Sequence, residues 1–336
     1  MPRRTFPLLL ALPAFITASV TAQDAKPVAP SEPTAPAGKP AKSDEQRSRT
    51  VDAYSAKVPA PTVSGVKYGE HERHVLDFWK ADSQSPTPLV FVIHGGGWVG
   101  GSKERVDRFV DVEQLLKAGI SVASINYRLI QRGVPETEPP VKAPLHDAAR
   151  ALQFVRTKAT EWNLDKSKIG AAGGSAGACS SLWLAFHDDL ADPASADPVA
   201  RESTRLFCAA VTGPQTTLDP AQMQEWTPNS NYGGHAFGFT KFTDFLAGRE
   251  KIAKLIEEYS PYALVTPDDP GVYMTFSAPP GIGQPQKDPT HTSNFGVKLQ
   301  EHCRSKGIAT ELVYPGAPEV QHATSTDYLI AKLKSK

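Results

Sequence analysis

Cysteine is scarce in this sequence, and neither sign of charge is in excess. Lysine and arginine together number 36, aspartate and glutamate also number 36, and the formal net charge is zero. A protein that binds nucleic acid needs a basic face for the phosphates, so this balance argues against nucleic acid as a main partner. Three cysteines allow at most one disulfide, and their apolar neighbours favour buried thiols. They are Cys179, Cys208 and Cys303.

Long apolar runs are also rare, except near the N-terminus. Residues 6–20 are mostly apolar, follow a basic start at Arg3 and Arg4, and end at small residues before Gln23. This pattern predicts a signal peptide over residues 1–22, and the arginine pair fits twin-arginine export from a bacterium. The alternative is a retained anchor, which the short, proline-containing run disfavours. We expect a periplasmic or extracellular protein with no stable membrane anchor.

Residues 23–50 lack the side chains that build a core. Alanine, proline, serine and lysine dominate this segment, which predicts a disordered linker. Residues 51–336 then form the folded part, and an apolar content of 40% in the whole chain suits one globular domain.

Apolar runs alternate with helical stretches through residues 51–336. Residues 145–155 have apolar side chains at helical spacing, and residues 74–79 alternate like an edge strand. Strands that alternate with helices predict an α/β fold, in which helices cover both faces of a mostly parallel sheet. The predicted strands are residues 74–79, 89–93, 120–127, 168–172, 206–211, 271–276 and 310–314.

Two glycine-rich motifs follow predicted strands. Gly173 to Gly177 matches the pattern G-x-S-x-G between a strand and a helix, which places Ser175 on a sharp, exposed turn. Upstream, residues 94–98 read HGGGW after another strand. Glycines let backbone N–H groups approach a negative oxygen closely, as an oxyanion hole requires. The alternative is a phosphate loop, but the Gly-Lys-Ser/Thr ending of such a loop is missing.

This pair of motifs, in this order, resembles the α/β-hydrolase fold. Within that fold, the chain is similar to esterases and lipases with an HGGG loop, the hormone-sensitive-lipase-like and feruloyl-esterase-like carboxylesterases. The resemblance runs from about Val66 to the C-terminus and is more specific in its first half. It implies an oxyanion hole formed by the N–H groups of Gly96, Gly97 and Ala176, and it implies no metal or cofactor.

A nucleophilic serine needs a base and an orienting carboxylate, which follow it in the order Ser, Asp or Glu, His in this fold. His322 follows the last predicted strand, where the fold places its base, and His235 is the runner-up. Asp288 matches the family's acid by its place before a helix, although a helix N-cap is the alternative and Glu319 is a reserve. The histidines after Ser175 are His187, His235, His291, His302 and His322.

A long insertion separates two of the predicted strands. Residues 214–262 contain two predicted helices, 219–226 and 241–259, and we expect them to form a cap over the site. Aromatic side chains there could line a substrate pocket or simply pack the cap. The candidate pocket residues are Trp226, Tyr232 and His235 from this insertion and Trp98 from the HGGGW motif.

The sequence thus predicts a secreted serine carboxylesterase that acts through an acyl-enzyme. Its substrate is expected to be a small-molecule ester or, by analogy, an acetyl or feruloyl ester of a polysaccharide. The alternatives are an arylformamidase-like or peptidase-like hydrolase of the same fold and a non-catalytic binding module. The last alternative is disfavoured because both Ser175 and candidate histidines are present.

Overall fold

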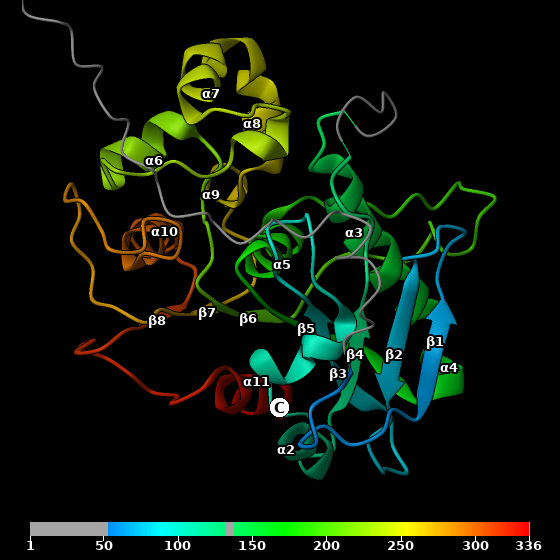
Figure 1. Cartoon of the computed structure of the whole chain (residues 1–336). Helices are drawn as coiled ribbons and strands as arrows, with labels where there is room; N and C mark the ends of the chain where they lie inside the picture. Colours follow the sequence, from blue (N-terminus) through cyan, green and yellow to red (C-terminus); the bar gives the residue numbers. More distant parts are fainter. Residues whose placement is uncertain (1–52, 132–137, 336) are drawn as a thin grey trace, which may run out of the picture. The chain divides into compact units, whose positions relative to one another are not determined.

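The chain forms an eight-stranded sheet with helices on both faces (Figure 1). The computed structural model describes residues 53–131 and 138–335, all within one unit that spans Val51–Lys336. The strand order is β1-β2-β4-β3-β5-β6-β7-β8, in which β1–β2 and β2–β4 are antiparallel and the other pairs are parallel. The strands are β1 Val63–Lys67, β2 Val75–Trp79, β3 Thr87–Ile93, β4 Ser121–Ile125, β5 Leu164–Gly174, β6 Cys208–Thr212, β7 Val272–Thr275 and β8 Thr310–Val313.

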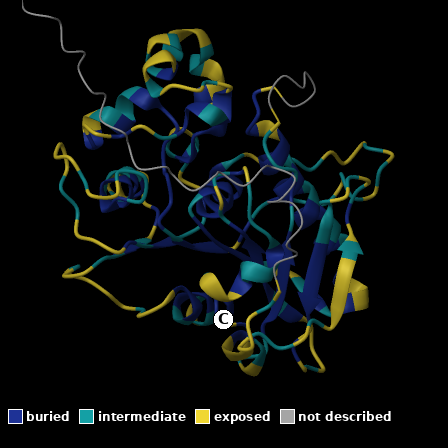
Figure 2. Cartoon of the chain, in the orientation of Figure 1, coloured by how far each residue is buried: buried dark blue, intermediate teal, exposed yellow. Residues whose placement is uncertain are grey.

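Two hydrophobic cores lie on opposite faces of this sheet. In β3, Leu89, Phe91 and Ile93 pack into one core, while Val90 and Val92 pack into the other. Successive side chains of a strand point to opposite faces, so a strand covered on both sides is apolar throughout. Figure 2 accordingly shows the central strands as buried. This explains why the sequence predicts the central strands as unbroken apolar runs.

Helices supply the covering layers. Helices α3, α5 and α10 contribute to the larger core, and α2 and α11 contribute to the smaller one. The α-helices are α2 Val112–Lys117, α3 Lys142–Thr157, α4 Ala159–Trp162, α5 Ala176–Phe186, α6 Pro220–Trp226, α7 Phe242–Gly248, α8 Ala253–Tyr259, α9 Pro261–Leu264, α10 Ser293–Ser305 and α11 Ser325–Leu333. The short 3₁₀ helices among the described residues are η1 Lys103–Arg108, η3 Gly234–Phe237 and η4 Arg249–Ile252.

The predicted α/β fold is confirmed, and each of the seven predicted strands is present. One prediction about the sheet is wrong: residues 74–79 do not form an edge, because β1 pairs with the outer side of β2. Strand β1 escaped prediction because it is short, mostly exposed and interrupted by Gly65, which has a φ of 66°. Such a strand has no apolar periodicity for a sequence pattern to detect.

The long segment between β6 and β7 consists of short helices that gather beyond one face of the sheet (Figure 1). Helix α6 agrees with the helix predicted over residues 219–226. The single helix predicted over residues 241–259 is wrong, because this stretch divides into α7, η4 and α8. Helix α7 ends at Gly248, a residue that favours helix ends, and a Cβ there would lie 2.8 Å from the Phe239 ring.

The predictions for the N-terminus, for a membrane anchor and for the cysteines have different outcomes. The proposed signal peptide, residues 1–22, and linker, residues 23–50, lie outside the described residues. Within the described residues, no helix combines the length and apolar character needed to cross a membrane. The three cysteines are free and buried, as predicted.

Candidate active site

Ser175 sits at a strained turn between β5 and α5. Its φ and ψ are 54° and −121°, a conformation that a residue with a side chain rarely adopts. The turn is held by a hydrogen bond from the Ser175 N–H to the Thr212 carbonyl, at 2.9 Å. Its flanking glycines are required sterically, because a Cβ on Gly173 or Gly177 would lie 2.6 or 2.1 Å from the Ile93 carbonyl oxygen. The turn therefore has the geometry of a nucleophile elbow.

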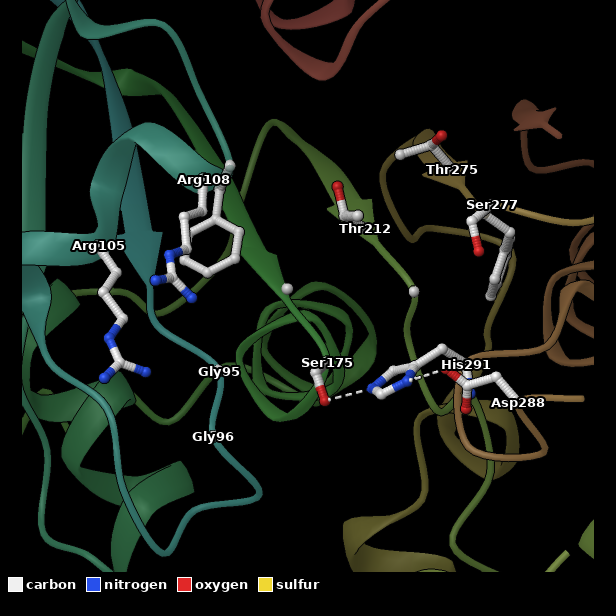
Figure 3. Close-up of a pocket in the computed structure, with 14 residues that line it drawn as sticks. Gly95, Gly96, Arg105, Arg108, Ser175, Thr212, Thr275, Ser277, Asp288 and His291 are labelled. Carbon is white, nitrogen blue, oxygen red and sulfur yellow. Dashed lines mark hydrogen bonds and ion pairs between the residues drawn. The ribbon is translucent and has the colours of Figure 1, made fainter. Parts of the chain in front are cut away.

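A histidine and a carboxylate follow Ser175 in one hydrogen-bonded chain (Figure 3). Ser175 Oγ lies 2.9 Å from His291 Nε2, and His291 Nδ1 lies 2.9 Å from Asp288 Oδ2. A carboxylate can only accept, so it fixes the ring proton on Nδ1 and leaves Nε2 free to accept the serine proton. This is the arrangement that makes a serine hydroxyl a nucleophile.

Asp288 is kept ionised by its surroundings. Partial burial alone would raise the pKa of Asp288. The hydrogen bond from the His291 ring and the electrostatic interaction with that ring lower the pKa below the ordinary value. The backbone N–H groups of Thr290 and His291 also donate to Asp288 Oδ1, both at 3.1 Å. The helix N-cap alternative for Asp288 is wrong, because Thr292 caps α10.

The loop between β7 and α10 carries both Asp288 and His291. The side chain of Gln215 donates to the Thr290 carbonyl at 2.8 Å, which ties this loop to the segment after β6. Gly213 lies directly beside the histidine, and a Cβ there would be 3.4 Å from His291 Cδ2. The segment after β6 thus holds the His291 ring against Ser175.

The predicted position of the base requires a correction. The structure places His291, not His322, against Ser175. His322 Nδ1 instead pairs with Glu311 Oε2 at 2.7 Å, and His322 lines a different cavity from the one at Ser175. The buried Glu311 also accepts from the backbone N–H groups of Gln321 and His322, at 2.8 and 2.7 Å. These three bonds hold the loop after β8 away from the serine.

The other acidic and basic candidates have different partners. His235 Nε2 donates to the Gly97 carbonyl at 3.0 Å, and exposed Glu319 lies 3.7 Å from Arg304. Neither residue lines the cavity at Ser175.

The predicted oxyanion loop lies beside Ser175. A Cβ on Gly95 would be 2.5 Å from the Gly174 carbonyl oxygen and 3.4 Å from Ser175 Cβ, so the loop is in close contact with the elbow. Gly96 and Gly97 adopt φ values of 112° and 63°, which favour glycine. No described residue accepts a hydrogen bond from either N–H, and Ala176 begins α5, where the N–H groups lack helical acceptors.

His94 braces this loop through its ring and its backbone. Its Nδ1 donates to the Gly95 carbonyl at 2.8 Å, its ring stacks on Tyr127, and the Tyr127 hydroxyl donates to the His94 carbonyl at 2.8 Å. Because a carbonyl can only accept, the Nδ1 proton is assigned, and Nε2 faces Arg73 at 3.3 Å.

The four candidate pocket residues do not line the cavity at Ser175. Trp98 is buried and donates to Ser180 Oγ at 3.0 Å, while Trp226 packs on Tyr262 and Phe295. Tyr232 and His235 make an edge contact with each other, and both lie next to Gly97. These aromatic residues therefore support the core and the oxyanion loop.

The cavity at Ser175 has a volume of about 380 Å³ and walls from both halves of the chain. Within residues 53–131 and 138–335, no cluster of three or more histidine, cysteine, aspartate or glutamate side chains is placed to hold a metal ion. The lining residues are Gly95, Gly96, Arg105, Arg108, Phe109, Gly174, Ser175, Thr212, Gly213, Thr275, Phe276, Ser277, Asp288 and His291.

Comparison with known proteins identifies the family. Residues 76–278 match the BD-FAE family. The chain belongs to this family. Versiconal hemiacetal acetate esterase of Dothistroma septosporum is 25% identical over 271 residues, covering 76% of this chain and 71% of that protein. Kynurenine formamidase of Meyerozyma guilliermondii is 30% identical over 124 residues, covering 35% of this chain and 41% of that protein.

Other matches are shorter or concern the fold alone. An α/β hydrolase of Acanthamoeba polyphaga mimivirus is 34% identical over 99 residues, 30% of this chain, and the chain spans 27% of that protein's length. A truncated carbohydrate esterase from gut microbiota aligns with a TM-score of 0.58 at 18% identity, covering 78% of this chain and 90% of that one. Fold, family and the esterases among the relatives place the chain among the carboxylic ester hydrolases.

His291 is a candidate functional residue that the sequence motifs do not single out. The available signal was its spacing of three residues from Asp288, which allows both side chains to meet within one loop. The order of strands and triad residues in the family points instead to a histidine in the loop after the last strand. In this BD-FAE protein, the histidine beside Ser175 and the carboxylate bonded to it come from the same loop.

Proposed function

We propose that this protein is a serine carboxylesterase with Ser175 as nucleophile, His291 as base and Asp288 as the orienting acid. The observation that carries the proposal is the hydrogen-bonded chain Ser175–His291–Asp288, with 2.9 Å in each step. Its position at a nucleophile elbow beside an HGGG loop agrees with acyl transfer rather than with a structural hydrogen bond.

The proposed reaction has two halves. Ser175 Oγ attacks the ester carbonyl carbon while His291 Nε2 takes the hydroxyl proton, and the carbonyl oxygen becomes negative. The N–H groups of Gly96, Gly97 and Ala176 are the proposed donors to that oxygen. The C–O bond to the alcohol then breaks, and His291 gives its proton to the departing alkoxide. Water, activated by the same histidine, hydrolyses the acyl-enzyme and restores Ser175.

For the substrate, we propose an ester with a short-chain or aromatic acyl group, including acetyl or feruloyl esters of polysaccharides. The cavity of about 380 Å³ has room for a small acyl group beside Ser175. A similar solved structure, described as an acetyl ester-xyloside bifunctional hydrolase from Caldicellulosiruptor lactoaceticus, has a TM-score of 0.54 at 23% identity and covers 77% of this chain and 85% of that one. The proposal also includes export directed by residues 1–22. It further includes a cap over the site, formed by residues 214–262.

A formamidase is the second candidate, and the match to a kynurenine formamidase favours it. The same triad would attack an N-formyl carbonyl and release an amine. Hydrolysis of N-formylkynurenine at a kcat/KM above that of acetyl and feruloyl esters would favour this candidate over the esterase.

The proposal is tested by Ser175→Ala. We expect hydrolysis of 4-nitrophenyl acetate to fall by about 10³-fold or more, because the acyl-enzyme cannot form. Ser305→Ala is a matched control, since the Ser305 hydroxyl donates to a carbonyl within the last turn of α10. Equal activity in Ser175→Ala and the control would refute the serine mechanism.

A further inference from the structure

Two arginines stand on one wall of the cavity at Ser175. Arg105 and Arg108 line it from η1, together with the ring of Phe109. Figure 3 shows both guanidinium groups on the side of Ser175 that is opposite to His291. The cavity therefore has a catalytic wall and a cationic wall, with the nucleophile between them.

Within the described lining residues, no carboxylate is paired with Arg108. Among the described lining residues, Asp288 supplies the carboxylate, and it is already bonded to His291 on the other wall. The Arg108 side chain is exposed, and no hydrogen bond or ion pair joins it to another described side chain. Arg105 has a further interaction of its own, so Arg108 is the more informative position. An arginine at a binding site that has no partner among the described side chains is suited to a carboxylate on a ligand.

The backbone that carries the arginines is firmly anchored. Lys103, at the start of η1, is 8% exposed, and its Nζ lies 2.8 Å from Asp77 Oδ2. Its backbone N–H donates to Asn126 Oδ1 at 2.7 Å, and its carbonyl accepts from Ser124 Oγ at 2.8 Å. Val106, between the two arginines, is 1% exposed. The guanidinium groups thus extend from a fixed base, which reduces the entropy lost when they bind a ligand.

The position of His291 determines which part of an ester faces the arginines. In the proposed reaction, His291 protonates the leaving alkoxide, so the alcohol part must lie on the His291 side of Ser175. The acyl part then extends toward the opposite wall. Phe109 lies along that path, because a Cβ on Gly174 would be 2.4 Å from its ring, and it offers an apolar surface to methylene groups.

We propose that the cavity selects esters whose acyl group ends in a carboxylate, the half-esters of dicarboxylic acids, and that Arg108 binds this carboxylate. This inference rests on the proposed esterase function and adds the substrate class. A hydrogen bond between two charged groups is strong, so one contact between a guanidinium group and the substrate carboxylate should raise kcat/KM about tenfold.

The test compares charged and uncharged esters of the same shape. In the acyl series, 4-nitrophenyl hemiadipate carries the carboxylate and 4-nitrophenyl adipamate is its neutral amide. In the alcohol series, 4-acetoxybenzoate and 4-acetoxybenzamide form the same pair. Values of kcat/KM are measured with blanks without enzyme at about pH 7, where these carboxylates are ionised. The variants are Arg108→Gln and Arg108→Lys, with Arg304→Gln, an exposed arginine near the other cavity, as the control.

We expect hemiadipate to exceed adipamate by about tenfold in the wild type, with the difference mainly in KM. Arg108→Gln should bring the ratio close to one, Arg108→Lys should keep part of it, and Arg304→Gln should leave it unchanged. About 0.5 M salt should reduce the wild-type ratio, because exposed charges are screened.

A wild-type ratio of one or less would overturn the inference, as would a preference that Arg108→Gln does not alter. A preference for the carboxylate in the alcohol series would overturn the acyl assignment. These outcomes differ from failure of the proposed function. If adipamate is hydrolysed and Ser175→Ala abolishes this activity, the esterase stands even when the charge preference is absent; if none of the four esters is hydrolysed, the esterase itself fails.

Discussion

Replacing His291 by alanine should remove most of the esterase activity while leaving the fold intact. His291 Nε2 is the histidine nitrogen that lies within hydrogen-bond distance of Ser175 Oγ, at 2.9 Å. Without it, the serine keeps its proton and the leaving alkoxide has no acid. We expect kcat/KM for 4-nitrophenyl acetate to fall by about 10³-fold or more, which corresponds to about 4 kcal/mol of transition-state stabilisation.

His322→Ala is the matched control, because the family order of triad residues points to His322 instead. Its ring pairs with Glu311, which keeps two backbone N–H partners in the variant. We expect activity within about threefold of the wild type and a loss of about 1 kcal/mol in unfolding free energy. Circular dichroism checks that both variants are folded. The reasoning is refuted if His322→Ala abolishes hydrolysis and His291→Ala does not.

Three further predictions concern the acid, the elbow and a buried ion pair. Asp288→Asn should lower kcat by about 10²- to 10⁴-fold, because the ring loses the acceptor that fixes its tautomer, and an unchanged kcat would exclude this role. Gly177→Ala should reduce the unfolding free energy by about 3 kcal/mol or more, because the new Cβ would lie 2.1 Å from the Ile93 carbonyl oxygen; an unchanged urea midpoint would contradict it. Burial alone would raise the pKa of Asp77, but hydrogen bonds from Lys103 and other groups lower it below the ordinary value. Asp77→Asn removes the charge that pairs with Lys103, so it should lower the unfolding free energy by about 3 kcal/mol near pH 7. Since the folded pKa lies below the unfolded value, this difference should shrink as the pH falls below about 4 and through the folded pKa; a difference that stays constant in acid-titrated urea midpoints would refute the linkage.

The strained turn at Ser175 and the HGGG loop beside it could be predicted from sequence because their requirements are local. Ser175 needs glycines on both sides of a tight turn, and Gly96 and Gly97 adopt positive φ values that favour glycine. Such constraints leave a pattern of a few adjacent residues. The central strands were equally predictable, since burial on both faces gives unbroken apolar runs.

The histidine that lies beside Ser175 could not be predicted in the same way because its position depends on tertiary structure. Two loops, after β7 and after β8, each offer a histidine near a carboxylate. Which loop bends toward Ser175 is decided by contacts far along the chain, such as Gln215 with Thr290, and by the pairing of His322 with buried Glu311. No sequence pattern contains these contacts. The exposed strand β1 was missed for a simpler reason, its lack of apolar periodicity.

The central claim, that Ser175 is an activated nucleophile, is tested most directly with a fluorophosphonate probe. The chain is incubated with the probe, digested, and the modified peptide is located by mass spectrometry. The account predicts one adduct on Ser175 that forms with loss of esterase activity, and much slower labelling in His291→Ala, because the hydroxyl then lacks its base. Absence of an adduct on Ser175, or full inactivation through an adduct on another residue, would contradict it.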